Sequence, residues 1–301
     1  MWSEAFDLHN HSIHSDGGNT PDYVAKAMKE AGVKVWSLTD HDTVQGYEEA
    51  SLAAEKNGLR FVCGVEITCR ATLGFSEGYS TFNYRVQQCP VKRSWHLLAY
   101  FPNLDIENPS AEFLRFQRWL DEFGSSRVSR MQKIIDKLAD LGMPLDEREV
   151  FSKATTMVGR PHLADAMVQA GYVKTRQQAF DEWIGDGKPA HVMRYVPTIA
   201  EAAHEVRLAN GITSLAHPLH YGIEPKRLMR HLVASNIDAV EAFHPDHSNK
   251  DRYEFWQAAK AEGLSITAGS DYHDLEHNPV VGKMPIPLAD LPAELRNLLV
   301  E

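Results

Sequence analysis

The stretch FDLHNHSIHSDGG, residues 6–18, places His9, His11, His14 and Asp16 directly after a short apolar run. Residues two apart on a strand point to the same side, so His9 and His11 form a side-by-side pair. Imidazole and carboxylate groups are common ligands of divalent metal ions. The stretch therefore predicts a first strand that carries metal ligands, provided that the rest of the chain supplies partners for them.

Further strands are predicted by short apolar segments, which cover residues 5–11, 33–41, 59–67, 95–101, 211–218, 238–244 and 264–273. Most of them are followed by turn residues and a helical pattern. In the pattern over 20–32, Thr20 is a suitable N-cap, Pro21 takes the first helical position and Gly32 ends the helix. Residues 198–211 have a similar layout. Strands that alternate with helices predict an α/β fold with a parallel sheet or barrel.

Ionisable residues recur along these segments. Six segments carry such residues in the run or just past its end, and the segment 95–101 carries His96 near its start. In chain order, the residues of the six segments are His9 and His11, then Asp40, His41 and Asp42, then Glu66, then His217, then Glu241 and His244, then Asp271 and His273. Sites in barrels form where parallel strands end, so these side chains can converge. A single histidine near a strand end is more often solvated than a ligand. Burying so many ionisable groups, however, costs several kcal/mol each unless they are paired or bind metal.

The overall charge bears on the class of partner. The chain of 301 residues has a formal net charge of −10, with no Lys/Arg cluster of the kind that binds long duplex nucleic acid. A small phosphorylated substrate remains compatible with this acidity, because bound divalent cations supply strong local positive charge.

The cellular setting is predicted from what the sequence lacks. No apolar run approaches the ~20 residues that cross a bilayer, and the N-terminus does not resemble a signal peptide. The cysteines, Cys63, Cys69 and Cys89, have no CxxC spacing, and Cys63 lies in an apolar run typical of a core residue. We therefore expect a cytoplasmic protein that does not associate with membranes.

The motifs DLHNHSIHSDG, LTDHD, GVEIT, AHP and GSDYH follow in this order between residues 7 and 273. As a set they resemble the motifs of the PHP (polymerase and histidinol phosphatase) superfamily of metal-dependent phosphoesterases. The resemblance implies a distorted (β/α)7 barrel with two or three divalent metal ions at the C-terminal ends of the strands. That architecture agrees with the apolar segments described above.

The resemblance also implies metal ligands in three groups. These are His9, His11 and Asp271 with the bridging Glu66 for the first ion, Glu66, His96 and His217 for the second, and Asp16, His41 and His273 for the third. His14 competes with Asp16 for the third group. Nitrogen and oxygen ligands without thiolate suit Mn, Zn, Fe or Mg. Asp7 and Asp42 are candidates for orienting ligand imidazoles, and Asp42 is equally suited to cap the helix that follows it.

Residues 103–195 depart from the alternation of strands and helices. Their apolar residues recur at helical spacing, as at Met131, Ile134, Ile135 and Leu138. We expect a barrel made of 1–102 and 196–301, with an inserted helical domain that caps the substrate.

Residues that contact the substrate are suggested by the motifs GRPHLADAM and GDGKPAHV, which are similar to the insertion of a PHP subgroup related to nucleoside 3′,5′-bisphosphate phosphatases and RNA-end exonucleases. Arg160, His162 and Lys188 are candidate phosphate contacts, as is His247 from the barrel. Each of them has an alternative role as a solvated turn or loop residue. Residues 70–94 form either a surface hairpin or a flap that stacks on a base.

The predicted function is metal-dependent phosphoesterase. We expect a metal-activated water to attack the phosphate ester of a nucleoside monophosphate, a 3′,5′-bisphosphate or a short oligonucleotide end, with His41, Asp271, His273 and Arg160 as catalytic residues. One alternative is a phosphatase of histidinol phosphate or another small phosphomonoester. The other is a non-catalytic module that binds nucleotide or a partner, which the complete ligand set disfavours. The sequence leaves the oligomeric state open.

Overall fold

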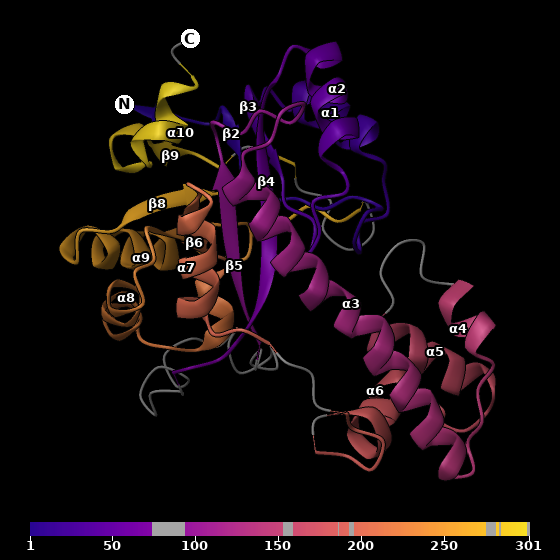
Figure 1. Ribbon diagram of the computed structural model, residues 1–301. Helices are drawn as coiled ribbons and strands as arrows, with labels where there is room; N and C mark the ends of the chain where they lie inside the picture. Colours follow the sequence, from indigo (N-terminus) through magenta and orange to yellow (C-terminus); the bar gives the residue numbers. More distant parts are fainter. Residues whose placement is uncertain are drawn as a thin grey trace. The chain divides into compact units, whose positions relative to one another are not determined.

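The computed structural model describes residues 1–73, 94–152, 159–185, 187–192, 196–274, 281–282 and 284–299, without the side chains of 123–127 and 152. The predicted hairpin or flap at 70–94 lies largely outside these residues. The chain forms two compact units, one of Met1–Arg118 with Val196–Glu301 and one of Trp119–Tyr195. Helix α3 (Ala111–Asp140) begins in the first unit and continues in the second (Figure 1).

The first unit is built on one seven-stranded sheet whose strands are neighbours in chain order. They are β2 (Phe6–Asp7), β3 (Val35–Leu38), β4 (Arg60–Arg70), β5 (Ser94–Phe101), β6 (Ile212–Leu215), β7 (Ala239–Phe243) and β8 (Ser265–Ala268). Each strand falls within or close to an apolar segment predicted from the sequence. Strand β5 pairs antiparallel with both β4 and β6, and the other pairs are parallel.

Backbone hydrogen bonds close this sheet between its first and last strands. The N–H of Leu8 donates to the carbonyl of Ala268 (3.0 Å), that of Asp271 to His9 (2.8 Å) and that of His11 to Tyr272 (2.8 Å). The sheet is therefore a nearly closed, distorted barrel, which confirms the predicted (β/α)7 architecture. We call this junction between residues 8–11 and 268–272 the barrel seam. It joins the stretch 6–18 to the motif GSDYH, residues 269–273.

The reversed direction of β5 explains the position of His96. In this antiparallel pair His96 lies opposite Thr68, close to the end of β4, while Phe101 lies opposite Cys63. The start of β5 thus meets the C-terminal ends of its neighbours. A ligand from β5 at that end must come early in the strand, as His96 does.

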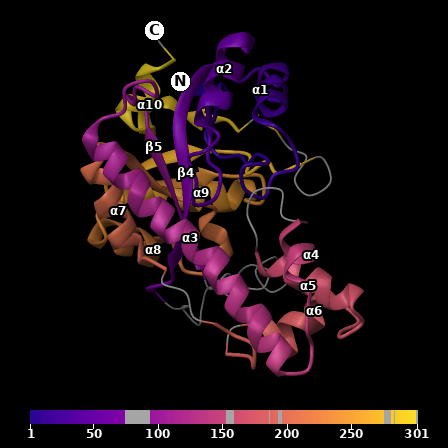
Figure 2. The ribbon, with the colours of Figure 1, turned by 45° about the vertical axis from the view of Figure 1, so that its right-hand side comes forward.

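Helices cover the outside of the barrel. They are α1 (Pro21–Glu30), α2 (Tyr47–Asn57), α7 (Ile199–Leu208), α8 (Pro225–Ala234), α9 (Asn249–Ala261) and α10 (Ala293–Asn297), with short 3-10 turns η2 (Pro218–Tyr221) and η3 (Leu288–Asp290). Figures 1 and 2 show α1 and α2 beside each other, and their apolar faces pack with Trp36 and Leu38 of β3. Thr20 caps α1, as predicted. Strand β1 (Trp2–Ser3) pairs antiparallel with β9 (Ile286–Pro287).

The second unit consists of helices around a core of its own. The later part of α3 is joined by α4 (Glu147–Ser152), α5 (Arg160–Gln169), α6 (Arg176–Ala179) and the π-helical turn η1 (Phe180–Ile184). Met131, Ile134, Ile135 and Leu138, the predicted apolar face, are buried in this core. The helical spacing of the sequence predicted an insertion that starts at residue 103. The compact unit starts later because Phe113 and Phe116 at the beginning of α3 pack on Phe101 of β5.

Among the described residues, no helix is long and apolar enough to span a membrane.

The N-terminus of α7 allows a test of local stability. Thr198 Oγ1 accepts from the N–H of Glu201 (3.2 Å), and the Glu201 carboxylate accepts from the N–H of Thr198 (2.7 Å). Thr198→Ala removes the first of these bonds, so we expect the free energy of unfolding in urea to fall by about 1 kcal/mol. Thr198→Ser retains the hydroxyl and should stay close to the wild type. Equal stability of all three proteins would show that this cap does not stabilise the helix.

Candidate metal centre

Four donor atoms meet at the barrel seam. His9 Nε2 lies 3.2 Å from His11 Nε2 and 3.3 Å from both Glu66 Oε2 and Asp271 Oδ1, and His11 Nε2 lies 3.2 Å from the same two oxygens. Donor atoms of His9, His11 and Glu66 all lie within 4.8 Å of one another, as a shared ion requires, and Asp271 Oδ1 lies beside both imidazoles. These residues could hold a divalent metal ion.

Strand alternation builds half of this set. His9 and His11 are both fully buried and turn toward the centre, whereas Asn10 between them turns away and accepts from the Trp36 indole N–H (2.7 Å). The backbone of Asp271 has a positive φ of 51°, and its carboxylate faces the same two histidines. Such a conformation is uncommon for aspartate, and functional sites often hold strained backbone of this kind.

Glu66 also faces a second set of donors. Its Oε1 atom lies 2.8 Å from His96 Nδ1 and 3.2 Å from His217 Nε2, while its Oε2 atom faces the first set. Glu66 is almost completely buried on β4. One carboxylate therefore presents each of its oxygens to a different group of histidines.

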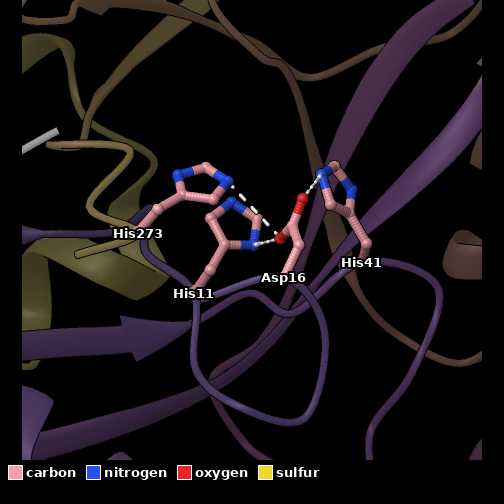
Figure 3. A group of neighbouring side chains, drawn as sticks. All are labelled: His11, Asp16, His41 and His273. Atoms are coloured by element: carbon pink, nitrogen blue, oxygen red, sulfur yellow. Dashed lines mark ion pairs between the residues drawn. The ribbon is translucent and has the colours of Figure 1, made fainter. Parts of the chain in front are cut away.

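A third set surrounds Asp16, as Figure 3 shows. Asp16 Oδ1 lies 3.4 Å from His273 Nε2 and 3.7 Å from His11 Nδ1, and Asp16 Oδ2 lies 3.6 Å from His41 Nε2. The rings of His11 and His273 stack with centroids 4.1 Å apart. These separations are wider than those of the first set. His14, the alternative to Asp16, instead pairs with Glu49 (3.1 Å).

The loop that carries Asp16 is held by Asp40. The Asp40 carboxylate accepts from the N–H of Ser12 (2.8 Å) and from the hydroxyls of Ser12 (2.7 Å) and Ser15 (2.5 Å). Asp40 thus uses its oxygens to order residues 12–15 instead of facing the donor sets.

Burial and charge act against each other at the centre. Burial raises the pKa of Asp271, but His9, His11 and His244 outweigh it and hold that pKa well below its usual range. Burial likewise opposes the charged form of His11, yet hydrogen bonds to Asp271 and Glu66 raise its pKa to about 10. The carboxylates are therefore ionised, and the imidazolium of His11 compensates their charge.

Glu241 is a residue of this centre whose role the sequence analysis missed. Glu241 is fully buried on β7. Its carboxylate accepts hydrogen bonds from His9 Nδ1 (3.0 Å) and from the backbone N–H of His217 (2.8 Å). The first bond holds a proton of His9 on Nδ1, so Nε2, which faces the donor set, is the atom that would bind a metal ion. The second holds His217, whose φ of 28° is strained. The only signal in the sequence was a glutamate inside an apolar strand.

Asp7 and Asp42, the two carboxylates expected to orient imidazoles, bond to backbone instead. Asp7 accepts from the N–H groups of Ser270 (3.0 Å) and Gly282 (2.8 Å). Asp42 accepts from the N–H of Thr68 (2.6 Å). Asp42 does not cap α2 either, because that helix begins at Tyr47 after Gly46. Both aspartates fix loops at the strand ends.

Three of the candidate substrate contacts lie in the second unit. Arg160 opens α5 and donates to the carbonyl of Ile184 (3.3 Å), and His162 accepts from the N–H of Gly159 (3.0 Å). Lys188 is exposed in the turn after η1. The fourth candidate, His247, is buried in the loop after β7 of the barrel. Their contact with substrate remains a prediction.

Known proteins resemble this chain over most of its length. The PHP domain family matches residues 7–100. A 5′-3′ exoribonuclease of Haemophilus influenzae is 31% identical over 274 residues, 90% of each chain. A 3′,5′-nucleoside bisphosphate phosphatase of Chromobacterium violaceum is 27% identical, over 89% of this chain and 86% of that protein. The crystal structure of a Bifidobacterium adolescentis protein described as a metal-dependent phosphoesterase superimposes with a TM-score of 0.69 and 25% identity, covering 98% of this chain and 95% of that one.

The barrel and its clustered donors define a metal-dependent hydrolase of phosphate esters. The chain belongs to the PHP family of metal-dependent phosphoesterases.

Replacing Glu241 tests how the ligands are oriented. Glu241→Gln keeps the size of the side chain but presents an amide N–H₂ either to His9 or to the N–H of His217. We expect metal affinity to fall about 10- to 100-fold, the usual cost of losing a group that orients a ligand. Chelator competition measures this. Glu254→Gln, on helix α9, is the control and should bind metal like the wild type; equal affinity of the Glu241 variant would remove Glu241 from the centre.

The raised pKa of His11 predicts a pH dependence in the metal-free protein. The pKa rises from 6.5 to about 10 on folding, so the charged imidazolium stabilises the fold fully below pH 6.5. This stabilisation should be lost as the pH rises toward about 10. Urea unfolding of EDTA-treated protein across this range measures the loss. His11→Asn should flatten the slope; an unchanged slope in that variant would assign the pH dependence to other groups.

Proposed function

We propose that this phosphoesterase hydrolyses a phosphate ester of a nucleotide, either a nucleoside monophosphate or 3′,5′-bisphosphate or the end of a short oligonucleotide. The observation that carries the proposal is the double role of Glu66, whose two oxygens face two different donor sets. A carboxylate placed in this way suits two metal ions side by side, the arrangement used for displacement at phosphorus. The names of the two relatives support the nucleotide as substrate class.

The ligands are proposed in three groups around Glu66. His9, His11 and Asp271 share the first ion with Glu66, His96 and His217 share the second with it, and Asp16, His41 and His273 hold a third. A neutral imidazole has one free lone pair, so His11 serves the first group through Nε2. Most of these ligands are imidazole nitrogens, which favours Mn, Zn or Fe over Mg.

Bound ions would activate a water nucleophile and neutralise the phosphate. The chain's own residues determine the side from which a substrate approaches. The exposed fraction of the side chains rises from 0% at His11 to 15% at His41, 23% at His273 and 53% at Asp16. The third group is thus the open side of the centre. We place His41, Asp271 and His273 next to the reacting phosphate on that side.

Phosphate contacts from the second unit complete the proposal. Arg160 stands at the first position of α5, where the N–H groups of the helix and a guanidinium both attract anions. Lys188 follows the end of η1, and the N–H of Lys188 donates to the carbonyl of Gly185 (3.1 Å). His162 stands in the same first turn of α5.

A panel of substrates tests the proposal, with inorganic phosphate measured for the monoesters and free nucleotide measured for RNA. Adenosine 3′,5′-bisphosphate, AMP, a short RNA and histidinol phosphate are each supplied with Mn²⁺. We expect turnover of the nucleotides to exceed that of histidinol phosphate. The reverse preference would leave the barrel chemistry intact and refute the nucleotide as substrate.

Variants connect the same assay to the centre. Asp271→Asn and His11→Ala each remove a proposed ligand, so turnover should fall at least about 100-fold, more than the loss of an orienting group causes. His14→Ala is the matched control, because His14 pairs with Glu49 outside the donor sets. Retained activity in Asp271→Asn would refute the ligand assignment.

A further inference from the structure

Two loops beside the centre bring together a separate His–His–Asp group. His220 lies in η2, after β6, and His244 and Asp246 follow β7. One nitrogen of each histidine and one oxygen of Asp246 lie within 4.8 Å of one another. None of these residues belongs to the ligand sets around Glu66. We propose that this group is an additional divalent-cation site that takes a transition-metal ion such as Zn²⁺.

The pair of His220 and Asp246 supplies the first two donors. His220 Nε2 lies 2.9 Å from Asp246 Oδ2, a hydrogen-bond contact that would open slightly when both atoms bind one ion through bonds of about 2.1 Å. The His220 ring is fixed by stacking on His217, with centroids 4.8 Å apart. The Asp246 side chain is 61% exposed, so an ion and its water ligands have access from solvent.

His244 has the hydrogen bonds of a metal-binding histidine. Its Nδ1 atom accepts from the N–H of Asp246 (3.1 Å), which places the ring proton on Nε2, where Asp271 Oδ2 lies 3.4 Å away. Metal-bound histidines commonly donate their other N–H to a carboxylate in this way. The Nδ1 lone pair therefore points toward the backbone of Asp246, and an ion would replace that N–H. Arg252 donates to the carbonyl of His244 (3.0 Å) and holds this loop.

His247 lies beside this group and carries a lone pair without a partner among the described residues. Its Nδ1 donates to the carbonyl of Ala242 (2.9 Å), so Nε2 carries the lone pair; that atom is buried without a hydrogen-bond partner among the described residues. The His247 ring lies 5.3 Å from that of His244. Imidazoles with one carboxylate form a donor set typical of Zn²⁺.

Zinc stoichiometry of the full-length protein tests this site. Wild type, His220→Ala, Asp246→Asn and the control His204→Ala are saturated with Zn²⁺, freed of excess metal and measured by elemental analysis. His204 is an exposed residue of α7. We expect the His220 and Asp246 variants each to bind one equivalent less than the wild type, and the control to bind the same number.

Anomalous scattering at the zinc edge locates the ion. A peak between His220 and Asp246 in wild-type crystals, absent in Asp246→Asn, would confirm the site. Zinc peaks found only at the three proposed ligand sets around Glu66, or equal stoichiometry in all four proteins, would overturn it. Because the count is made against the wild type, the result does not depend on whether nucleotides are the substrate.

Discussion

Closure of the barrel between its first and last strands is the constraint on which the site depends. The backbone bonds of Leu8, His9 and His11 to residues 268–272 fix the register between two segments that are far apart in the sequence. His9 and His11 then face Asp271 across the seam at 3.2–3.3 Å. A slip of one residue along this seam would turn both histidines away from the centre, since the side-chain period of a strand is two.

The charges at the seam explain why the surrounding loops are tied down so firmly. Buried carboxylates and imidazoles in contact stabilise the fold only while their geometry is kept, because an unpaired buried charge costs several kcal/mol. Glu241 keeps that geometry by bonding to both His9 and the strained backbone of His217. Asp7, Asp40 and Asp42 do the same for the loops at the strand ends. These four carboxylates accept hydrogen bonds from backbone or imidazole N–H groups. They thereby hold in place the residues of the donor sets.

The strands, and the clustering of acids and histidines at their ends, were predictable from the sequence, because both leave local patterns. The alternation around His9 and His11 and the repeated acid or histidine at the strand ends are visible without a structure. The role of Glu241 was not predictable, because nothing local tells which imidazole a buried glutamate will face across 232 residues. The reversed direction of β5 was also missed, since apolar runs look alike in either direction. Asp42 was misjudged as a possible cap because its positive φ of 52° depends on the loop that it anchors to Thr68.

The seam also determines when the centre can form. During synthesis His9 and His11 are made before the other strands of the barrel, and strand β8 and Asp271 follow only after nearly all of the barrel has been made. Contacts between such distant segments are slow to form, because a long loop must close before they stabilise the chain. His9 and His11 therefore lack Asp271 as a neighbour until strand β8 and the residues after it have been made. The first donor set is complete only when this segment docks against β2, which ties the metal site to closure of the barrel.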